Sequence, residues 1–286
     1  MDPSSLLSAI NRRHGTAFAL GARFRHGEQG AYAVVGQGGT RAVLKWSDGA
    51  AAMEAASRAT ATVRVLRGAG YPAPRYLLVG TEAGVCFWIQ EALPGVPMHA
   101  ATGHHVERLI ALNALQVGRA TAGGPDWAER IIRPVLAGGD DGYCRIESLQ
   151  TYSATTAALL ASIQTFVTAH RTEAFETRDI VHFDFNPLNI LVDAGQVSGV
   201  IDWEGTCAGD SAFDLATLLF YAYEEPGVRE RLWRAAGARA NPGTVGVYLA
   251  HLIARQLDWS IRHHSEGSIR YWIDTAHTIL GDLRAR

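Results

Sequence analysis

Residues 180–204, which read IVHFDFNPLNILVDAGQVSGVIDWE, constrain the fold more than any other stretch of the chain. A polar loop precedes two short β-branched runs, at 190–192 and 197–201, and these flank a turn that contains glycine. This pattern predicts an antiparallel hairpin. Neighbouring strands lie about 4.8 Å apart, so the hairpin would bring Asn189, just before the first strand, beside Asp202, just after the second.

The polar residues around this hairpin indicate phosphoryl transfer. The amide oxygen of Asn189 and the carboxylate of Asp202 would converge on one hard cation, which prefers oxygen ligands. Asp184, five residues before Asn189, would lie above that cation, free to take a proton. A single Asp or Asn in a loop is usually a turn or cap residue. Several such residues, correctly spaced around a hairpin, favour the phosphoryl-transfer reading.

The same residues resemble a known family. His182-x-Asp184-x-x-x-x-Asn189, followed by Ile-Asp-Trp-Glu at 201–204, is similar to the pattern of the aminoglycoside phosphotransferase and choline-kinase-like enzymes, distant relatives of the protein kinases. The segment GDSAFDLA at 209–216 resembles the family's G-D-P-x-x-D-L-A signature, with serine in place of proline. The resemblance implies an α+β, protein-kinase-like bilobal fold, with an N-terminal five-stranded antiparallel sheet and one helix, and a mainly helical C-terminal lobe.

The resemblance also implies a role for each matching residue. Asp184 would be the catalytic base, and Asn189 and Asp202 would be magnesium ligands. His182 and Asp214 would be structural braces for the loop. The implied cofactors are magnesium and ATP, with GTP as an alternative.

Two positions depart from the pattern. Phe183 stands where these enzymes mostly carry glycine, and it puts a bulky ring beside the base. Trp203 and Glu204 stand where protein kinases have Phe-Gly, which argues against a protein-kinase activation switch.

Overall composition excludes several classes of partner. A net charge of −2 and a pI near 6.6 give no electrostatic footprint for nucleic acid or an anionic membrane. No apolar run reaches the 18 or so residues of a membrane helix, and the N-terminus lacks the features of a signal peptide. The three cysteines, Cys86, Cys144 and Cys207, are odd in number and far apart. They predict reduced thiols in a cytoplasmic protein.

Lys45 is the only lysine among 26 basic residues. A chain that uses arginine almost everywhere keeps lysine where a guanidinium is too large, such as a confined phosphate pocket. Lys45 ends the strand-like run 41–46, where the resemblance places the lysine that binds the nucleotide phosphates. A chance remnant of mutational bias is the alternative.

The rest of the N-terminal lobe follows from local patterns and from the resemblance. We expect helices at 4–14, capped by Ser4 or Ser5, and at 50–67, with further strands at 18–25, 31–36, 75–80 and 85–90. The turn 26–30, with Gly27 and Gly30, would cover the ATP phosphates, although an ordinary hairpin turn fits equally well. Glu54 is the candidate partner of Lys45, against the alternative of a solvated helix-face acid.

The segment 90–95, QEALPG, resembles the family's hinge. Backbone groups of Glu91, Ala92 and Leu93 would then bind the adenine edge. A shift in composition just after this segment predicts a nucleotide-binding lobe at 1–94. The second lobe, at 95–286, would hold the catalytic loop and the acceptor-binding helices.

Helical patterning dominates the second lobe. We expect helices at 104–122, 151–170, 211–223, 225–237, 243–263 and 266–285, and an irregular insertion at 125–150. Acids and aromatics recur near the C-terminus and suit a cationic, hydroxyl-bearing acceptor. The alternative for each is a solvated acid or a core tryptophan. The candidate acceptor-binding residues are Glu204, Glu224, Glu225, Asp258, Trp259, Glu266 and Trp272.

The sequence therefore predicts an ATP- and Mg-dependent O-phosphotransferase. Its acceptor would be a hydroxyl of a small cationic antibiotic, an aminoglycoside or a tuberactinomycin of the viomycin or capreomycin type, and the reaction would confer resistance. A metabolic kinase for choline, a sugar or homoserine is the alternative within the same fold. A catalytically silent nucleotide-binding module is a third possibility. The short interval 202–214 argues against a protein kinase, which needs room for an activation segment.

Overall fold

The computed structural model describes residues 1–24, 30–121, 126–139 and 143–285. The chain forms two compact units: Met1–Met98 with Leu188–Thr206, and His99–Pro187 with the segment from Cys207 onward. The first division falls four residues after the expected boundary between residues 94 and 95. The expected lobes placed the whole hairpin in the C-terminal part, whereas residues 188–206 pack with the N-terminal unit.

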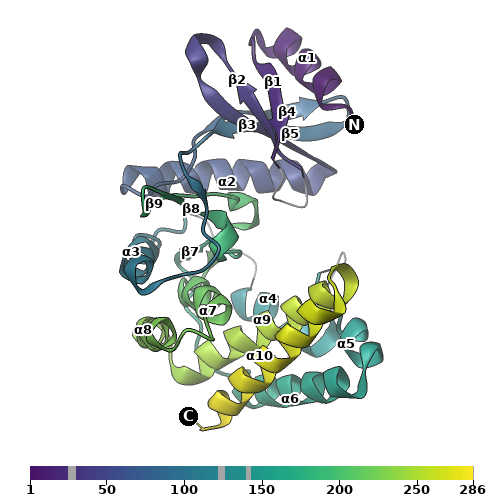
Figure 1. Cartoon of the computed structure of the whole chain (residues 1–286), viewed down its shortest axis with the longest axis vertical. Coiled ribbons are helices and arrows are strands. Elements are labelled where there is room, and N and C mark those ends of the chain that lie inside the picture. Colours follow the sequence, from purple (N-terminus) through teal and green to yellow (C-terminus); the bar gives the residue numbers. More distant parts are fainter. Residues whose placement is uncertain (25–29, 122–125, 140–142, 286) are drawn as a thin grey trace. The chain divides into compact units, whose positions relative to one another are not determined.

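An antiparallel five-stranded sheet forms the centre of the first unit (Figure 1). Its strand order is β1-β2-β3-β5-β4. The predicted α+β class, with five strands in the N-terminal part, is confirmed. The strands are β1 (Ala19–Arg23), β2 (Tyr32–Val35), β3 (Arg41–Asp48), β4 (Tyr76–Glu82) and β5 (Val85–Glu91).

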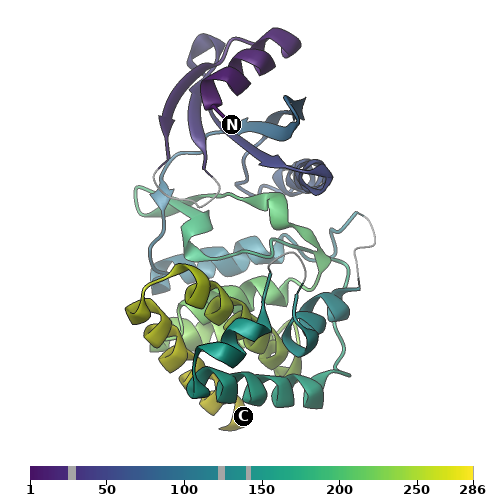
Figure 2. The ribbon, with the colours of Figure 1, turned by 90° about the vertical axis from the view of Figure 1, so that its right-hand side faces the viewer.

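Period-two alternation gives this sheet two apolar faces. On β5, Val85, Phe87 and Ile89 pack into a core with α1 (Pro3–His14). Cys86 and Trp88 point to the opposite face, where Ala56 of α2 (Ala50–Gly68) packs against them. The two helices therefore cover opposite faces of the sheet, and Figure 2 shows α2 nearly end-on.

The N-cap of α1 differs from the expected serine. Asp2 is the cap residue, and its carboxylate accepts a hydrogen bond from the Ser5 backbone N–H at 2.8 Å. Pro3 occupies the first helical position, where its missing N–H costs nothing.

The predicted hairpin is present as β8 (Ile190–Asp193) and β9 (Gln196–Val200). The short strand β6 (Val96–Pro97) pairs with β8 and makes a three-stranded sheet. The backbone N–H of Val200 also donates to Pro72 O at 2.8 Å, and that of Met98 donates to Ile190 O at 2.7 Å. These bonds explain why the hairpin belongs to the N-terminal unit.

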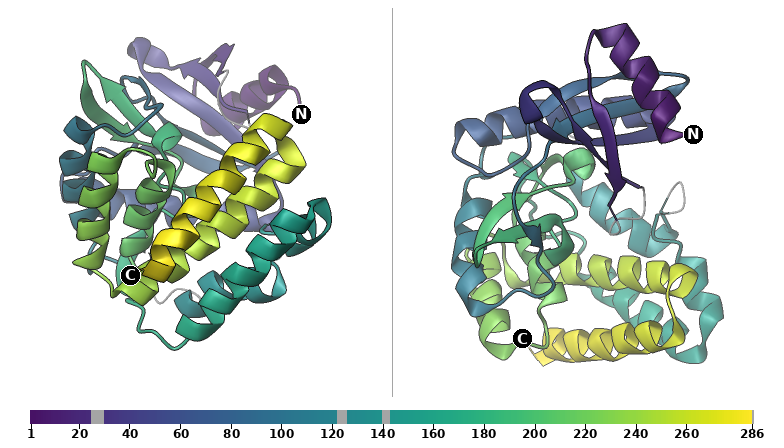
Figure 3. Two further views of the ribbon diagram at one scale, coloured as in Figure 1. Left: turned by 60° about the horizontal axis from the view of Figure 1, so that its bottom comes forward. Right: turned by 45° about the horizontal axis from the view of Figure 1, so that its top comes forward.

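The second unit is mainly helical, with one two-stranded sheet formed by β7 (Asp179–Val181) and β10 (Cys207–Gly209). Its helices are α3 (Gly103–Ala114), α4 (Trp127–Ala137), α5 (Ile146–Tyr152), α6 (Ala154–His170), α7 (Ala212–Tyr221), α8 (Pro226–Gly237), α9 (Pro242–His263) and α10 (Glu266–Ala285). The helices α6, α9 and α10 lie side by side (Figure 3). No helix among the described residues is long and apolar enough to cross a membrane.

Three expectations for this unit were wrong in detail. The helix expected at 104–122 ends at Ala114. The insertion expected to be irregular contains α4 and α5, and Asp126 caps α4 by accepting a hydrogen bond from the Glu129 N–H. The helix expected from residue 151 is interrupted at Ser153, which forms a capping box with Thr156 and starts α6.

A cluster of aromatic side chains packs around Phe183, in the loop that follows β7. Phe183 in that loop stacks on Phe213 of α7, with ring centroids 5.2 Å apart, and Trp127 and Tyr143 pack around the pair. The guanidinium of Arg130 lies 4.2 Å from the centre of the Phe183 ring. Phe183 has a positive φ of 73°, a conformation that favours glycine. Packing of the ring offsets this backbone strain.

We expect that only glycine fits at position 95, where the chain entering β6 passes close to the hairpin. A Cβ there would lie 2.6 Å from Val192 O and 2.7 Å from Ser198 Oγ, whereas a Cβ at Gly84 would meet nothing within 4 Å. Both glycines have positive φ, so alanine strains both by about 1–2 kcal/mol. We expect Gly95→Ala to lower the free energy of unfolding by about 2 kcal/mol more than Gly84→Ala. Urea denaturation of both variants measures the difference, and equal losses would contradict the close approach.

Phe183→Gly separates backbone strain from packing. The variant relieves about 1–2 kcal/mol of strain but loses about 3–5 kcal/mol of aromatic burial. We therefore expect a net loss of about 2 kcal/mol in unfolding free energy. Ala194→Gly is the matched control, because Ala194 has φ 48° and is exposed in the hairpin turn. The control should be neutral or stabilising by up to about 1 kcal/mol, and a Phe183→Gly variant of wild-type stability would refute the compensation.

Candidate active site

Strand β3 presents Lys45 on the face of the sheet opposite to α1. Ala42 and Leu44 of the same strand are in the core beneath α1, so alternation turns Lys45 to the other face. Lys45 pairs in register with Trp88 of β5. Its side chain is 18% exposed.

Two carboxylates from the end of the hairpin meet this lysine. Lys45 Nζ lies 2.7 Å from Asp202 Oδ1 and 3.6 Å from Glu204 Oε2. Burial disfavours the charged ammonium, but the two carboxylates outweigh it and raise the pKa of Lys45 above its usual value. The lysine therefore carries its charge at neutral pH.

Glu204 lies in the N-terminal unit and is held there by Tyr76 of β4. The Tyr76 hydroxyl donates to Glu204 Oε1 at 2.5 Å. Burial raises the pKa of Glu204 to about 7, against the opposing effect of Lys45. Burial and the neighbouring carboxylate also raise the pKa of Tyr76, which therefore remains a hydrogen-bond donor. The Glu204 carboxylate is thus engaged with Tyr76 and Lys45, and its predicted part in acceptor binding stays a prediction.

Asn189 and Asp202 stand beside each other at the mouth of the hairpin. Ile190 pairs with Val200, and the next N–H along, that of Ile201, donates to Asn189 O at 2.9 Å. Asp202 has φ 68° and ψ 56°, a left-handed conformation that strains a non-glycine residue. An amide oxygen and a carboxylate are ligands that suit Mg²⁺, which is commonly held by one or two carboxylates and completed by substrate phosphates. The donor set at this position fits such a cation.

The hinge segment has one clear candidate donor. The N–H groups of Glu91 and Ala92 donate to the carbonyls of Arg75 and Arg41, at 2.8 and 3.1 Å. The Glu91 carboxylate lies 3.1 Å from Arg67 Nη1 and 3.7 Å from Arg75 Nε. Of the backbone groups expected to bind adenine, the N–H groups of Glu91 and Ala92 are thus engaged within the unit, and the binding of adenine here stays a prediction.

Leu93 also packs against the hairpin. A Cβ added at Gly199 would lie 2.5 Å from Leu93 Cδ1, so a larger residue on β9 would displace the end of this side chain. The contact brings the hinge and the hairpin together within one unit.

Two further predictions for the nucleotide site concern Glu54 and the turn with Gly27 and Gly30. Glu54 is exposed on α2, whereas Lys45 forms ion pairs with Asp202 and Glu204 in this structure, so the partnership with Glu54 stays a prediction. The helix turns Ala56, Ala59 and other small or apolar residues inward, which leaves Glu54 on the solvent side. Gly27 lies outside the described residues. Gly30 has φ 68°, a conformation that favours glycine.

In the second unit, a buried carboxylate organises the loop after β7. Asp214 accepts hydrogen bonds from the backbone N–H groups of His182 and Phe183, at 2.8 and 3.1 Å. Gln116, two residues after the end of α3, donates to the same carboxylate at 2.6 Å. Burial raises the pKa of Asp214, while His182 and these hydrogen bonds oppose the shift. The His182 ring in turn accepts from the Asp184 N–H at 3.3 Å.

Arg255 of α9 fixes the Asp184 side chain. Its Nη2 donates to Asp184 Oδ1 at 2.6 Å, and its Nη1 donates to Phe183 O at 3.1 Å. The Asp184 side chain remains 33% exposed. This arrangement holds one carboxylate oxygen in place and leaves the group within reach of solvent.

Sequence reasoning missed three of these contacts. Arg255 could have been noticed as a charged residue within the apolar helix 243–263, where a cation needs a partner. Gln116 and Tyr76 carry no comparable signal, because their partners are far away in the sequence.

The residues proposed for the acceptor pocket do not form one lining. Asp258 is buried and lies 2.7 Å from Arg262 Nη2, and Ser148 also donates to it. Trp272 stacks on Phe220, with ring centroids 5.0 Å apart. Both side chains thus have partners inside the unit, and their part in acceptor binding stays a prediction.

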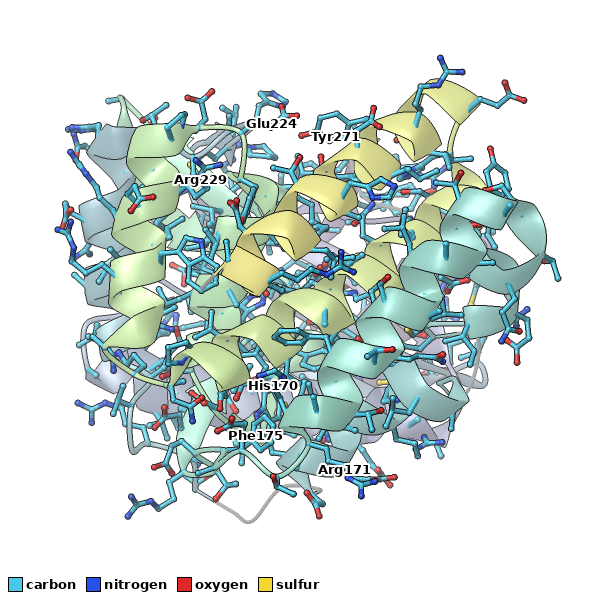
Figure 4. The ribbon with its side chains drawn as sticks, turned by 90° about the horizontal axis from the view of Figure 1, so that it is seen from below. His170, Arg171, Phe175, Glu224, Arg229 and Tyr271 are labelled. Carbon is cyan, nitrogen blue, oxygen red and sulfur yellow. The ribbon has the colours of Figure 1, made fainter. Side chains whose placement is uncertain are left out.

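The other acceptor candidates are at least partly accessible. Glu224 lies near Tyr271 at the face shown in Figure 4 and raises the pKa of that tyrosine, together with burial. Trp259 packs on His263, with centroids 4.0 Å apart. Glu225 and Glu266 are exposed at the beginnings of α8 and α10. Their part in acceptor binding stays a prediction.

Comparison with known proteins gives a family and a fold. Residues 21–248 match the family described as the phosphotransferase enzyme family (APH). Hygromycin-B 4-O-kinase of Escherichia coli is 41% identical over 46 residues, which are 16% of this chain and only 14% of that protein.

Solved structures are similar over nearly the whole chain. A thermostable mutant of aminoglycoside phosphotransferase APH(4)-Ia, in ternary complex with AMP-PNP and hygromycin B, has a TM-score of 0.73 at 17% identity, covering 97% of this chain and 98% of that one. Choline kinase LicA from Streptococcus pneumoniae has a TM-score of 0.68 at 12% identity, covering 97% and 99%. At these identities the likeness shows a common fold. With most of its length matched, the chain belongs to the phosphotransferase enzyme family.

Proposed function

We propose that this protein transfers the γ-phosphoryl group of ATP, with magnesium, to a hydroxyl of a small molecule. The observation that carries the proposal is the grouping of Lys45, Asn189 and Asp202 on one compact unit, together with the hinge donor of Leu93. The family match supports the same reaction class. GTP remains an alternative phosphoryl donor, since a backbone hinge can bind either base edge.

Asp184, the proposed catalytic base, lies close in sequence to Asn189. Asp184 precedes Asn189 by five residues. A chain extends at most about 3.6 Å per residue, so the two Cα atoms lie within about 18 Å of each other. Chain connectivity alone therefore limits the separation between the proposed base and the first proposed metal ligand.

The chain's own residues have distinct tasks in this mechanism. Lys45 binds the nucleotide phosphates, and the Leu93 N–H orients the adenine ring. Asn189 and Asp202 would hold magnesium, which supplies neutralisation of the phosphate charge when bound. Asp184, oriented by Arg255, accepts the proton of the acceptor hydroxyl. Most of the rate acceleration comes from positioning and electrostatics.

For the acceptor, we propose an aminoglycoside-type antibiotic or a similarly cationic compound, such as a tuberactinomycin. Support comes from the sequence similarity to a hygromycin-B 4-O-kinase and from the fold of the APH(4)-Ia complex. It does not come from Asp258 or Glu204, whose carboxylates are engaged within the protein. A small-alcohol kinase is the second candidate, because choline kinase LicA has the same fold. Growth of a sensitive bacterium expressing the gene, across both antibiotic classes, tests the resistance role.

Asp184→Asn is expected to lower kcat by about 10²–10⁴-fold, because the variant cannot take the hydroxyl proton. Its affinity for the nucleotide should be nearly unchanged, since the carboxylate acts on the acceptor. Asp193→Asn is the control, because Asp193 is an exposed residue of the hairpin turn. Steady-state kinetics with an acceptor that the wild-type enzyme phosphorylates measures the turnover of both variants. Near-normal turnover of Asp184→Asn would refute the role of Asp184.

Lys45→Ala and Asp202→Ala are expected to abolish productive nucleotide binding. Each variant removes a charge that the triphosphate or its cation requires. Isothermal titration with Mg·AMP-PNP measures the affinity directly. Wild-type affinity in both variants would contradict the assignment of this unit as the nucleotide site.

A further inference from the structure

Lys45 contacts two carboxylates, and only one of them remains available when the cation is bound. Asp202 is the closer partner, at 2.7 Å, and is also the proposed magnesium ligand. An ammonium and a divalent cation repel each other at one carboxylate. Lys45 must therefore give up Asp202 as its close partner once the nucleotide and its cation arrive. The other carboxylate beside the lysine is that of Glu204, whose Oε2 lies 3.6 Å from Lys45 Nζ.

Helix α2 does not supply the acid that usually holds such a lysine. Protein kinases pair the strand lysine with a glutamate of the following helix. In this chain Glu54 is the only acid of α2, and it is exposed, whereas the inward positions carry Ala56, Ala59 and Val63. The helix therefore buries small apolar residues where a pairing glutamate would be required.

Glu204 has the features of a fixed partner. Its Oε1 accepts the Tyr76 hydroxyl, which sets the orientation of the carboxylate. Its Oε2 is buried, faces Lys45 and has no hydrogen-bond partner among the described residues. A buried carboxylate oxygen of this kind is costly unless a charged donor completes it.

The backbone around Glu204 is anchored on both sides. The indole of Trp203 is fully buried and donates to Val200 O at 2.9 Å. Arg58 of α2 donates to Thr206 O at 2.7 Å. The short turn Trp203–Gly205 is thus fastened both to the hairpin and to α2, so the Glu204 side chain starts from a fixed point.

We propose that Glu204 is the positioning residue that holds Lys45 against the nucleotide phosphates, in place of a helix glutamate. This inference rests on the proposed function, because it presumes a nucleotide at Lys45. Tyr76 orients Glu204, Glu204 orients Lys45, and Asp202 is released to the cation. The helix α2 then contributes the Arg58 anchor and not a carboxylate.

Glu204→Gln tests the assignment with little change of shape, since the amide oxygen can still accept from Tyr76. Loss of a charge-assisted contact predicts Mg·AMP-PNP binding weakened by about 10–100-fold. Glu54→Gln is the contrasting variant and should bind within about twofold of wild type. Thermal unfolding without nucleotide checks that each variant is folded. Tyr76→Phe, which keeps the carboxylate but frees its orientation, should show a smaller loss.

A double variant shows whether Tyr76 acts through Glu204. In a Glu204→Gln background, Tyr76→Phe should cause little further loss of nucleotide affinity, because Tyr76 acts on the lysine only through that carboxylate. Four results would overturn the inference: wild-type affinity in Glu204→Gln, a loss in Glu54→Gln instead, an additive loss in the double variant, or an effect confined to the magnesium requirement. The last result would make Glu204 a direct metal ligand. Absence of nucleotide binding by the wild-type protein would instead refute the proposed function, and this inference with it.

Discussion

The ion pair between Lys45 and the carboxylates at the end of the hairpin is the interaction on which the N-terminal unit depends. It joins β3 to a segment 157 residues later in the chain. Pairing of β6 with β8 and the packing of Leu93 over Gly199 bring the two segments together. The result is a sheet, a hinge and a hairpin that act as one body. The lysine, the candidate metal ligands and the hinge donor are therefore positioned by the same core.

The chain divides the chemistry between its two units. Residues 188–206 pack with the N-terminal unit, and the loop with Asp184 packs with the second. Asp214 accepts a hydrogen bond from that loop, and Gln116 donates to Asp214. Arg255 orients the Asp184 carboxylate. The residues proposed for nucleotide binding and the residue proposed for proton transfer therefore belong to different units.

Local patterns predicted the parts that depend on neighbouring residues. The hairpin, the single lysine on β3 and the long helices α9 and α10 follow from periodicity and turn chemistry, and the structure has them. The carboxylates that meet Lys45 in the structure were not predicted, because a sequence shows an acid in a helix but not the face it occupies. The ion pair between Asp258 and Arg262 was not predicted either, since the two side chains are seen to meet only when α9 is built. Arg255 gave the signal of a charge within an apolar helix but not the identity of its partner, and Tyr76 gave no signal, because both contacts join residues distant in sequence.

The most direct measurement is the anomalous scattering of Mn²⁺ in crystals grown with AMP-PNP. The account predicts that the ion is bound by Asn189 and Asp202, with the Lys45 ammonium on the nucleotide phosphates and no longer on Asp202. An ion bound away from both residues, or a nucleotide bound while Lys45 keeps its contact with Asp202, would contradict it.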